Sequence, residues 1–111
     1  MIFDIQDIND VKVIKIINDA LDASNIKDFK NDIAIYIESC KNIILDLSDI
    51  KFIDSSGLGS IISCLRQLHS NNGELKLSNL TKPVKALFEL VRLHKIFEIY
   101  NSNVEAANSF K

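Results

Sequence analysis

Short strand-like segments alternate with segments of helical periodicity along the chain. Asn42–Leu47 is a short apolar run between polar residues, which is typical of a buried central strand. In the segment that follows Asp54, apolar residues recur at three- and four-residue spacing from Leu58 to Leu68, which predicts an amphipathic helix. A helix between two strands of one sheet is the usual crossover connection of parallel strands. The alternation therefore predicts an α/β fold.

The same pattern extends to both ends of the chain. The expected strands are 2–5, 11–17, 42–47, 74–78 and 96–100. The expected helices run from Ser24 through Ile37, over 55–69, from an opening at 81–83, and over 104–110. Gly73 is expected to take the left-handed conformation that ends a helix or makes a turn. The 111 residues hold no repeat and no linker, so we expect one domain over 1–111.

Composition and charge exclude several classes of function. The net charge of -2 offers no basic footprint for direct nucleic-acid binding, and no apolar run approaches the length of a membrane span. Acidic residues where a signal peptide carries bases predict a cytoplasmic protein. Cys40 and Cys64 form no metal or disulfide pattern, and His69 and His94 are isolated, so we expect no metal and no cofactor. Four bases lie on and after the helix that opens at 81–83, and they form a mildly basic stretch (Lys82, Lys85, Arg92 and Lys95). This stretch is either a solvated face or a patch for a partner or an anion.

The segment Asp54-Ser55-Ser56-Gly57-Leu58-Gly59 joins a strand-like stretch to a helix. The first N–H groups of a helix lack partners within it, and the helix dipole is positive there, so this junction suits an anion such as a phosphate. Capping of the helix by Asp and Ser side chains explains the same residues without any ligand. Position 62 is Ile where a dinucleotide fingerprint needs Gly, and the chain has neither a P-loop nor a Gly-x-Ser-x-Gly motif. Capping and anion binding both remain open at this point.

Four segments in order resemble the STAS domain of bacterial anti-sigma factor antagonists. They are 44–47 (ILDL), 52–59 (FIDSSGLG), 73–77 (GELKL) and 83–88 (PVKALF), and the resemblance covers nearly the whole chain. It implies the STAS fold, a mixed and mostly parallel central sheet with helices packed mainly on one face. The second segment is its most specific part.

The resemblance implies a switch controlled by phosphorylation and not an enzyme. In that family the unmodified antagonist binds an anti-sigma factor that is also a serine kinase of the histidine-kinase-like ATPase superfamily, and this binding releases the sigma factor. Phosphorylation of the Ser after the motif Asp ends the binding, and a serine phosphatase restores it. On this chain the acceptor is Ser55, and Ser56 is interpreted as a helix cap. The partner-binding residues that the resemblance implies are Asp22, Asp54, Ser55, Ser56, Gly57, Leu58 and Gly59.

The loop at 19–24 departs from the family in one residue. The family often has Gly-x-Leu-Asp here, and Leu21 and Asp22 match while Asp19 replaces the Gly. The resemblance places this loop near Ser55, so Asp22 is a candidate partner contact, with a turn carboxylate as the alternative.

Other functions with the same fold remain open. Similar small STAS proteins are permanent subunits of lipid-transport ATPase complexes, and others act on different signalling regulators. Some STAS domains have been suggested to bind nucleotides. No base is spaced to activate Ser55 as a nucleophile, which argues against an enzyme. The domain is long enough to be a stable monomer.

Overall fold

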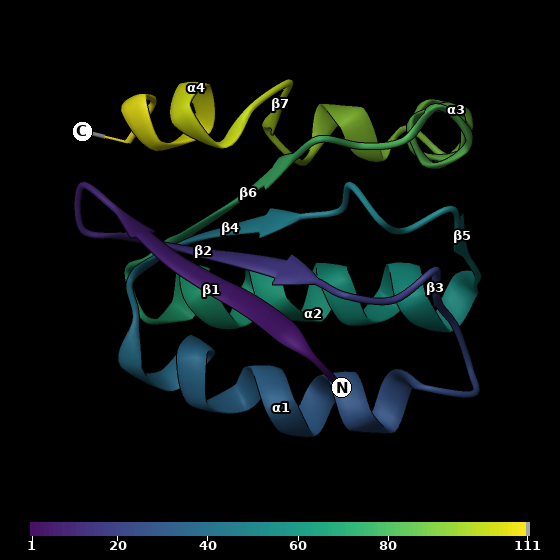
Figure 1. Cartoon of the computed structure of the whole chain (residues 1–111), viewed down its shortest axis with the longest axis horizontal. Helices are drawn as coiled ribbons and strands as arrows, with labels where there is room; N and C mark the ends of the chain where they lie inside the picture. Colours follow the sequence, from purple (N-terminus) through teal and green to yellow (C-terminus); the bar gives the residue numbers. More distant parts are fainter. Residues whose placement is uncertain (111) are drawn as a thin grey trace.

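A five-stranded sheet with strand order β1-β2-β4-β6-β7 forms the centre of the computed structural model, which describes residues 1–110 (Figure 1). Only the β1–β2 pair is antiparallel, and the other three pairs are parallel, which confirms the mixed, mostly parallel sheet that the family resemblance implied. The strands are β1 (Phe3–Ile8), β2 (Val11–Ile16), β4 (Asn42–Asp46), β6 (Glu74–Ser78) and β7 (Ile99–Tyr100). The helices are α1 (Ile26–Ser39), α2 (Ser55–Ser70), α3 (Lys82–Leu90) and α4 (Asn103–Asn108), with a 3-10 turn η1 (Leu93–Lys95).

The first two strands form a tight hairpin, which makes β1 longer than the sequence predicted. Ile8 pairs with Val11, so only Asn9 and Asp10 lie in the turn. Both have positive φ angles, 50° and 68°. Asn and Asp adopt this conformation more readily than other non-glycine residues, and it gives the turn a twist that matches the strands.

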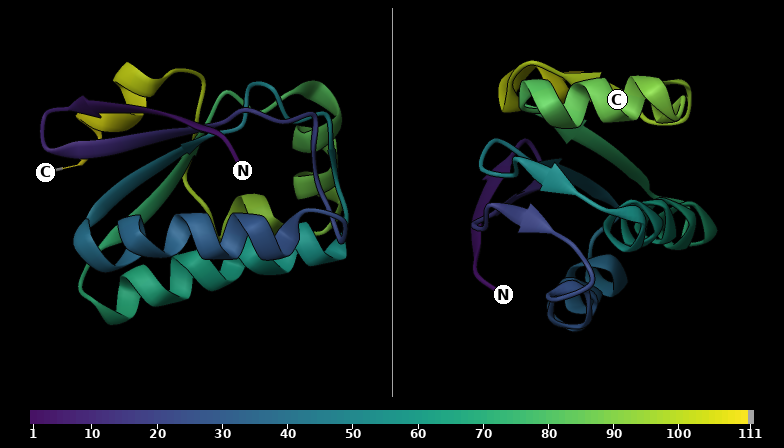
Figure 2. Two further views of the ribbon diagram at one scale, coloured as in Figure 1. Left: turned by 60° about the horizontal axis from the view of Figure 1, so that its bottom comes forward. Right: turned by 90° about the vertical axis from the view of Figure 1, so that its right-hand side faces the viewer.

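The long helices α1 and α2 lie side by side along one face of the sheet (Figure 2). Side chains alternate along each strand, so Ile43 and Leu45 of β4 point into the core beneath these helices, while Ile44 packs with α4 on the opposite face. Phe29 of α1 and Leu68 of α2 are completely buried in the larger core. Val84 and Phe88 of α3 join the same core at its edge, near Phe97.

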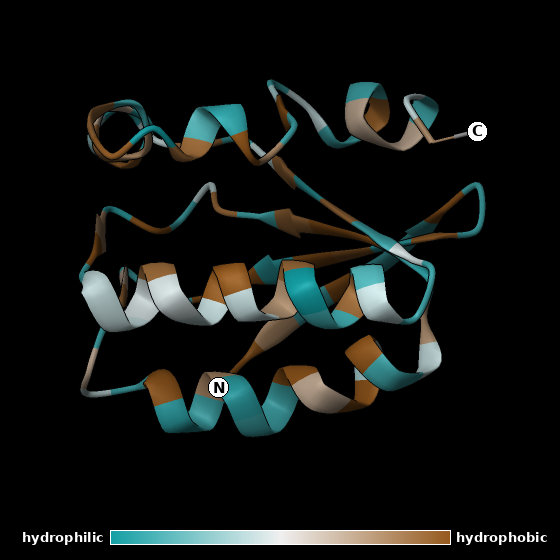
Figure 3. Cartoon of the chain, turned by 180° about the vertical axis from the view of Figure 1, so that it is seen from behind, coloured by the Kyte–Doolittle hydropathy of each residue, from teal (hydrophilic) through white to brown (hydrophobic). Residues whose placement is uncertain are grey.

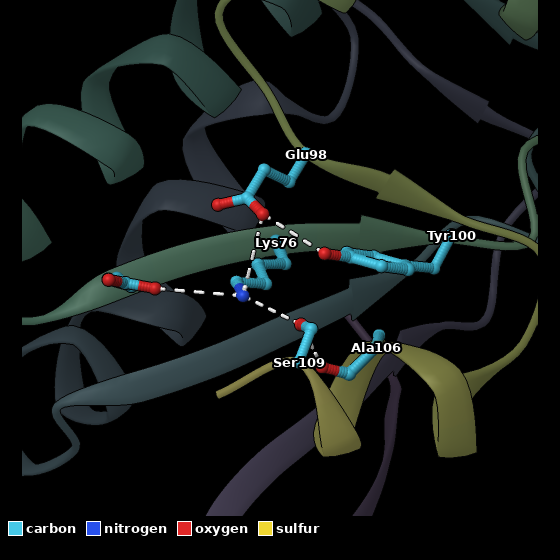
Figure 4. A network of polar contacts seen from close by, with 6 residues as sticks. Lys76, Glu98, Tyr100, Ala106 and Ser109 are labelled. Carbon is cyan, nitrogen blue, oxygen red and sulfur yellow. Dashed lines mark hydrogen bonds and ion pairs between the residues drawn. The ribbon is translucent and has the colours of Figure 1, made fainter. Parts of the chain in front are cut away.

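A buried lysine fixes the short helix α4 to the sheet (Figure 4). The Lys76 side chain on β6 is 4% exposed, and its Nζ donates a hydrogen bond to Ser109 Oγ at 2.6 Å. The same Nζ lies 4.3 Å from the centre of the Phe110 ring and 3.6 Å from Oε1 of Glu98. Beside it, Asn103 Nδ2 donates to the buried Asp46 Oδ2 at 2.9 Å. The second face is therefore closed by polar contacts as well as by alanines.

Two local predictions were wrong, each because a neighbouring residue takes the expected position. Asn25 and not Ser24 precedes α1, since the Ser24 hydroxyl is bonded to Asp22. At the end of α2, Asn72 takes the left-handed conformation (φ 62°), while Gly73 is needed because a Cβ there would lie 2.1 Å from the Lys41 carbonyl oxygen.

The expected strand at 96–100 is reduced to the two residues of β7. The backbone N–H of Phe97 donates to the carbonyl oxygen of Leu93, so the chain continues the η1 turn through this point. The Phe97 ring is thereby buried against Phe88, with ring centres 6.0 Å apart. Within residues 1–110, no helix combines the length and the apolar character that crossing a membrane requires.

Candidate functional site

The motif at 52–59 lies where a second, very short sheet meets the start of α2. β3 (Ala20–Leu21) pairs in parallel with β5 (Phe52–Ile53), so the 19–24 loop is held beside the motif. The backbone N–H of Lys51 donates to the Asp19 carbonyl oxygen at 2.6 Å, and that of Asp54 donates to Leu21 at 3.3 Å. Asp19 is not among the residues with a positive φ, so its backbone conformation at this position does not require glycine.

Asp54 is the residue that caps α2, which corrects the assignment of this role to Ser56. Its Oδ1 accepts a hydrogen bond from the backbone N–H of Gly57 at 3.0 Å. Its Oδ2 accepts one from the backbone N–H of Ala23 at 2.9 Å, so one carboxylate joins the helix start to the 19–24 loop. The pKa of Asp54 is lowered from its ordinary value, mainly by the Gly57 hydrogen bond and further by Ala23 and Ser56. Asp54 is therefore a fixed negative charge at neutral pH.

Glycine occupies the two motif positions 57 and 59 for different physical reasons. A Cβ on Gly57 would lie 2.2 Å from the Leu21 carbonyl oxygen and 2.7 Å from Cγ2 of Ile53, so α2 approaches β3 more closely than any side chain allows. A Cβ on Gly59 would meet no atom within 4 Å, because this residue lies on the open side of the helix. Gly57 is required by packing, whereas Gly59 leaves the surface near Ser55 unobstructed.

Ser55 is the first residue of α2, and its side chain is exposed. Ser56 is half-buried, and Leu58 packs against the main core. The N–H groups of the first helical turn face the same end of α2 as Ser55, and the dipole of the 16-residue helix is positive there. This geometry exposes a hydroxyl group in a place where added negative charge is electrostatically tolerated within the domain.

Asp22 is held by its own loop. Its Oδ1 accepts hydrogen bonds from the backbone N–H of Ser24 at 2.9 Å and from the Ser24 hydroxyl at 2.6 Å. Asn25 in turn accepts the Asp22 N–H at 3.0 Å and donates to the Ala20 carbonyl oxygen at 2.8 Å. The loop thus has one defined shape beside Asp54, and Asp22 is half-buried within it.

The sequence analysis missed an apolar groove next to this motif. Phe52 is 57% exposed and lines this groove together with residues of α3. In Figure 3 the brown of apolar residues appears on β5 and on part of α3. The groove has a volume of about 230 Å³, and its lining residues are Lys51, Phe52, Ile53, Pro83, Val84 and Leu87. No sequence pattern marks this groove, because β5 has only two residues, and its outward Phe52 and inward Ile53 are seen only in the structure.

The cysteines give no sign of nucleophilic chemistry. Burial raises the pKa of the Cys64 thiol to about 11, which keeps it protonated and unreactive at neutral pH. Cys40 is half-buried and, like Cys64, is a free thiol.

Comparison with known proteins agrees with the geometry. A family model described as the STAS domain matches residues 3–106. The anti-sigma F factor antagonist of Paenibacillus polymyxa is 36% identical over 75 residues, which is 68% of this chain and 64% of that relative, just under two thirds of its length. The anti-sigma-B factor antagonist of Bacillus subtilis is 34% identical over 53 residues, 48% of this chain and 49% of the relative.

Solved structures share the fold over nearly the whole chain. A crystal structure of a Thermotoga maritima protein superposes with a TM-score of 0.85 at 28% identity, covering 96% of this chain and 92% of that one. The unphosphorylated form of the antagonist SpoIIAA superposes with a TM-score of 0.78 at 23% identity, covering 96% of this chain and 94% of the other, and at that identity shows the fold alone. With the family model matching from β1 into α4, this chain belongs to the STAS domain family.

Proposed function

We propose that this protein is an anti-sigma factor antagonist whose binding is switched by phosphorylation of Ser55. The observation that carries the proposal is the exposed Ser55 hydroxyl at the start of α2, beside a capping Asp54 that is already bonded on both oxygens. Relatives named as antagonists of anti-sigma factors F and B support the partner class, an anti-sigma factor. The structure of SpoIIAA in a phosphorylated form shows that a protein of this fold accepts a phosphoryl group.

In this proposal the protein acts by binding and not by catalysis. The unmodified surface around Ser55, with Asp22, Asp54, Ser56, Gly57, Leu58 and Gly59, contacts an anti-sigma factor that is also a serine kinase. That kinase transfers the γ-phosphoryl group of ATP to Ser55 Oγ and releases ADP. A serine phosphatase later hydrolyses the phosphate ester and restores the binding form.

The charge at the helix start explains why the fold survives while the interface is lost. A phosphoserine carries about -1.5 to -2 charges at neutral pH. The N-terminal dipole of α2 tolerates this charge within the domain. Against a partner, however, it adds to the fixed charge of Asp54, and a packed interface has no water to screen the two. We therefore expect phosphorylation to abolish binding with little change in stability.

This function is tested by titration calorimetry, which measures the affinity of the protein for the anti-sigma serine kinase encoded in the same genome. With ADP present, the wild type and Ser55→Ala bind, whereas Ser55→Asp binds at least about tenfold more weakly, a change of about 1.4 kcal/mol. With ATP, the wild type becomes phosphorylated and dissociates, whereas Ser55→Ala remains bound. The proposal is contradicted if Ser55→Asp binds the kinase as tightly as the wild type does. It is also contradicted if the protein binds a transport ATPase stably and is not phosphorylated.

A further inference from the structure

Part of the exposed apolar surface of this domain lies beside the motif, along the α3 groove defined above by Lys51, Phe52, Ile53, Pro83, Val84 and Leu87. Pro83, Leu87 and Leu90 follow one another at the spacing that places residues on one face of a helix. Leu90 is 80% exposed, and Val91 after it is 45% exposed. Leu87 is partly packed against the main core, whereas Phe52, Pro83 and Leu90 are exposed.

Bases outnumber acids along the α3 side of this surface. Residues 81–96 carry four bases and one acid, a balance of +3 in a chain whose net charge is -2. Lys51, Lys82, Lys85 and Arg92 are all exposed, and none of them forms an ion pair with a carboxylate of residues 1–110. The surface therefore complements a partner that presents carboxylates around apolar side chains.

The shape and charge of the surface favour a protein segment over the other occupants. The surface is a groove with Phe52 as a wall, which fits the ridge of a helix, whereas a flat bilayer would touch mainly the protruding Leu90. A symmetric pair of copies would place the same basic patch on both sides of the contact, with only Glu89 of residues 81–96 to balance four bases.

We propose that the α3 groove is the anchoring site for an acidic amphipathic helix of the anti-sigma factor. This inference rests on the proposed function, because it takes that factor as the partner. Phe52 lies three residues before Ser55, so a protein that covers Ser55 also reaches the groove. The groove then supplies affinity that does not depend on phosphate, and Ser55 supplies control.

The test compares matched charge insertions by calorimetry with the same purified serine kinase and ADP. Leu90→Glu places an acid in the basic apolar surface, and Ile35→Glu makes the same change at a 65% exposed site on α1. We expect Leu90→Glu to weaken binding about tenfold and Ile35→Glu to change it less than about twofold. Phe52→Ala, which introduces no charge, is expected to weaken binding by a similar factor, and thermal melting confirms that each variant is folded.

The outcomes separate the groove from the switch. If Leu90→Glu and Phe52→Ala bind like the wild type while Ser55→Asp does not, the groove inference is overturned and the switch stands. If the wild type itself does not bind the kinase, both proposals fall. A wild-type dimer in sedimentation that Leu90→Glu dissociates would assign the surface to a second copy of the chain and overturn the inference.

Discussion

Two polar clusters of this domain have opposite relations to solvent. Around Lys76, a buried ammonium group is surrounded by a hydroxyl, carboxylates and an aromatic ring, all of the same chain. Around Asp54, the carboxylate is similarly occupied by two backbone N–H groups, but the neighbouring Ser55 hydroxyl is exposed at a helix start. The first cluster has satisfied its polar groups internally, whereas the second leaves a hydroxyl group exposed.

This difference indicates which polar groups maintain the fold and which are free for function. The density of hydrogen bonds is high in both places and does not separate them. What separates them is whether a group that can be modified remains exposed after the surrounding groups are bonded. The Lys76 cluster therefore explains the docking of α4, and the Asp54 cluster explains the placement of Ser55.

The largest change in stability is expected at Gly57, for which Gly59 is the matched control. Gly57→Ala forces a Cβ against the Leu21 carbonyl oxygen and should lower the free energy of unfolding by about 3 kcal/mol or more. Gly59→Ala meets no atom and should raise it by up to about 1 kcal/mol, because alanine favours the helix. Urea denaturation of the pair measures both, and equal effects would show that the close approach of α2 to β3 is wrong.

Substitutions at Lys76 should change stability without changing partner binding. Lys76→Ala removes the Ser109 hydrogen bond and leaves a gap under α4, for an expected loss of about 2 kcal/mol. Lys76→Met keeps the buried aliphatic stem and should cost less than about 1 kcal/mol. Urea denaturation gives the stabilities, and calorimetry with the partner gives the affinity. A loss of affinity in folded Lys76→Met would break the distinction between the two clusters.

At Asp54 we expect a stability contribution that depends on pH. Its folded-state pKa is lowered, so the stability that ionised Asp54 adds is present above the ordinary carboxyl pKa and is lost as pH falls through the lowered folded value. Asp54→Asn keeps a capping oxygen but no charge, so its melting temperature should lie a few degrees below wild type at pH 7, and the difference should disappear in acid. Melting curves across this range test the sign. A difference that grows as the pH falls would contradict the bonding of Asp54.

The smallest effect on stability is expected at Ser55 itself. Ser55→Asp adds an acid to the first turn of α2, which should change the free energy of unfolding by no more than about 0.5 kcal/mol. The same variant is expected to lose partner binding. Substitution at Ser55 should therefore change binding and not stability, whereas substitution at Lys76 should change stability and not binding. A strongly destabilised Ser55→Asp protein would attribute any binding loss to unfolding.

The sequence predicts those parts of this fold that have regular periodicity. The apolar spacing from Leu58 to Leu68 identified α2, and the apolar run at 42–47 identified β4. The strands β3 and β5 have two residues each, so they carry no periodicity, and yet they position the 19–24 loop beside Asp54.

The candidate site divides in the same way. The Asp and Ser residues at 54–57 predict a helix start. Which side chain caps α2 is decided by the Gly57 N–H, which donates to Asp54. The exposure of Phe52 depends on where α3 packs relative to β5, a tertiary relation that local spacing does not contain. The groove could therefore be found only in three dimensions.

The central claim, that Ser55 is the phosphorylated residue of a binding switch, is tested most directly on protein isolated from the cells that make it. Intact-mass analysis with fragment mapping would find one added phosphoryl group in a fraction of the molecules, on Ser55. A phosphoryl group on Ser56 would contradict the residue assignment, and its complete absence under every growth condition would contradict the switch.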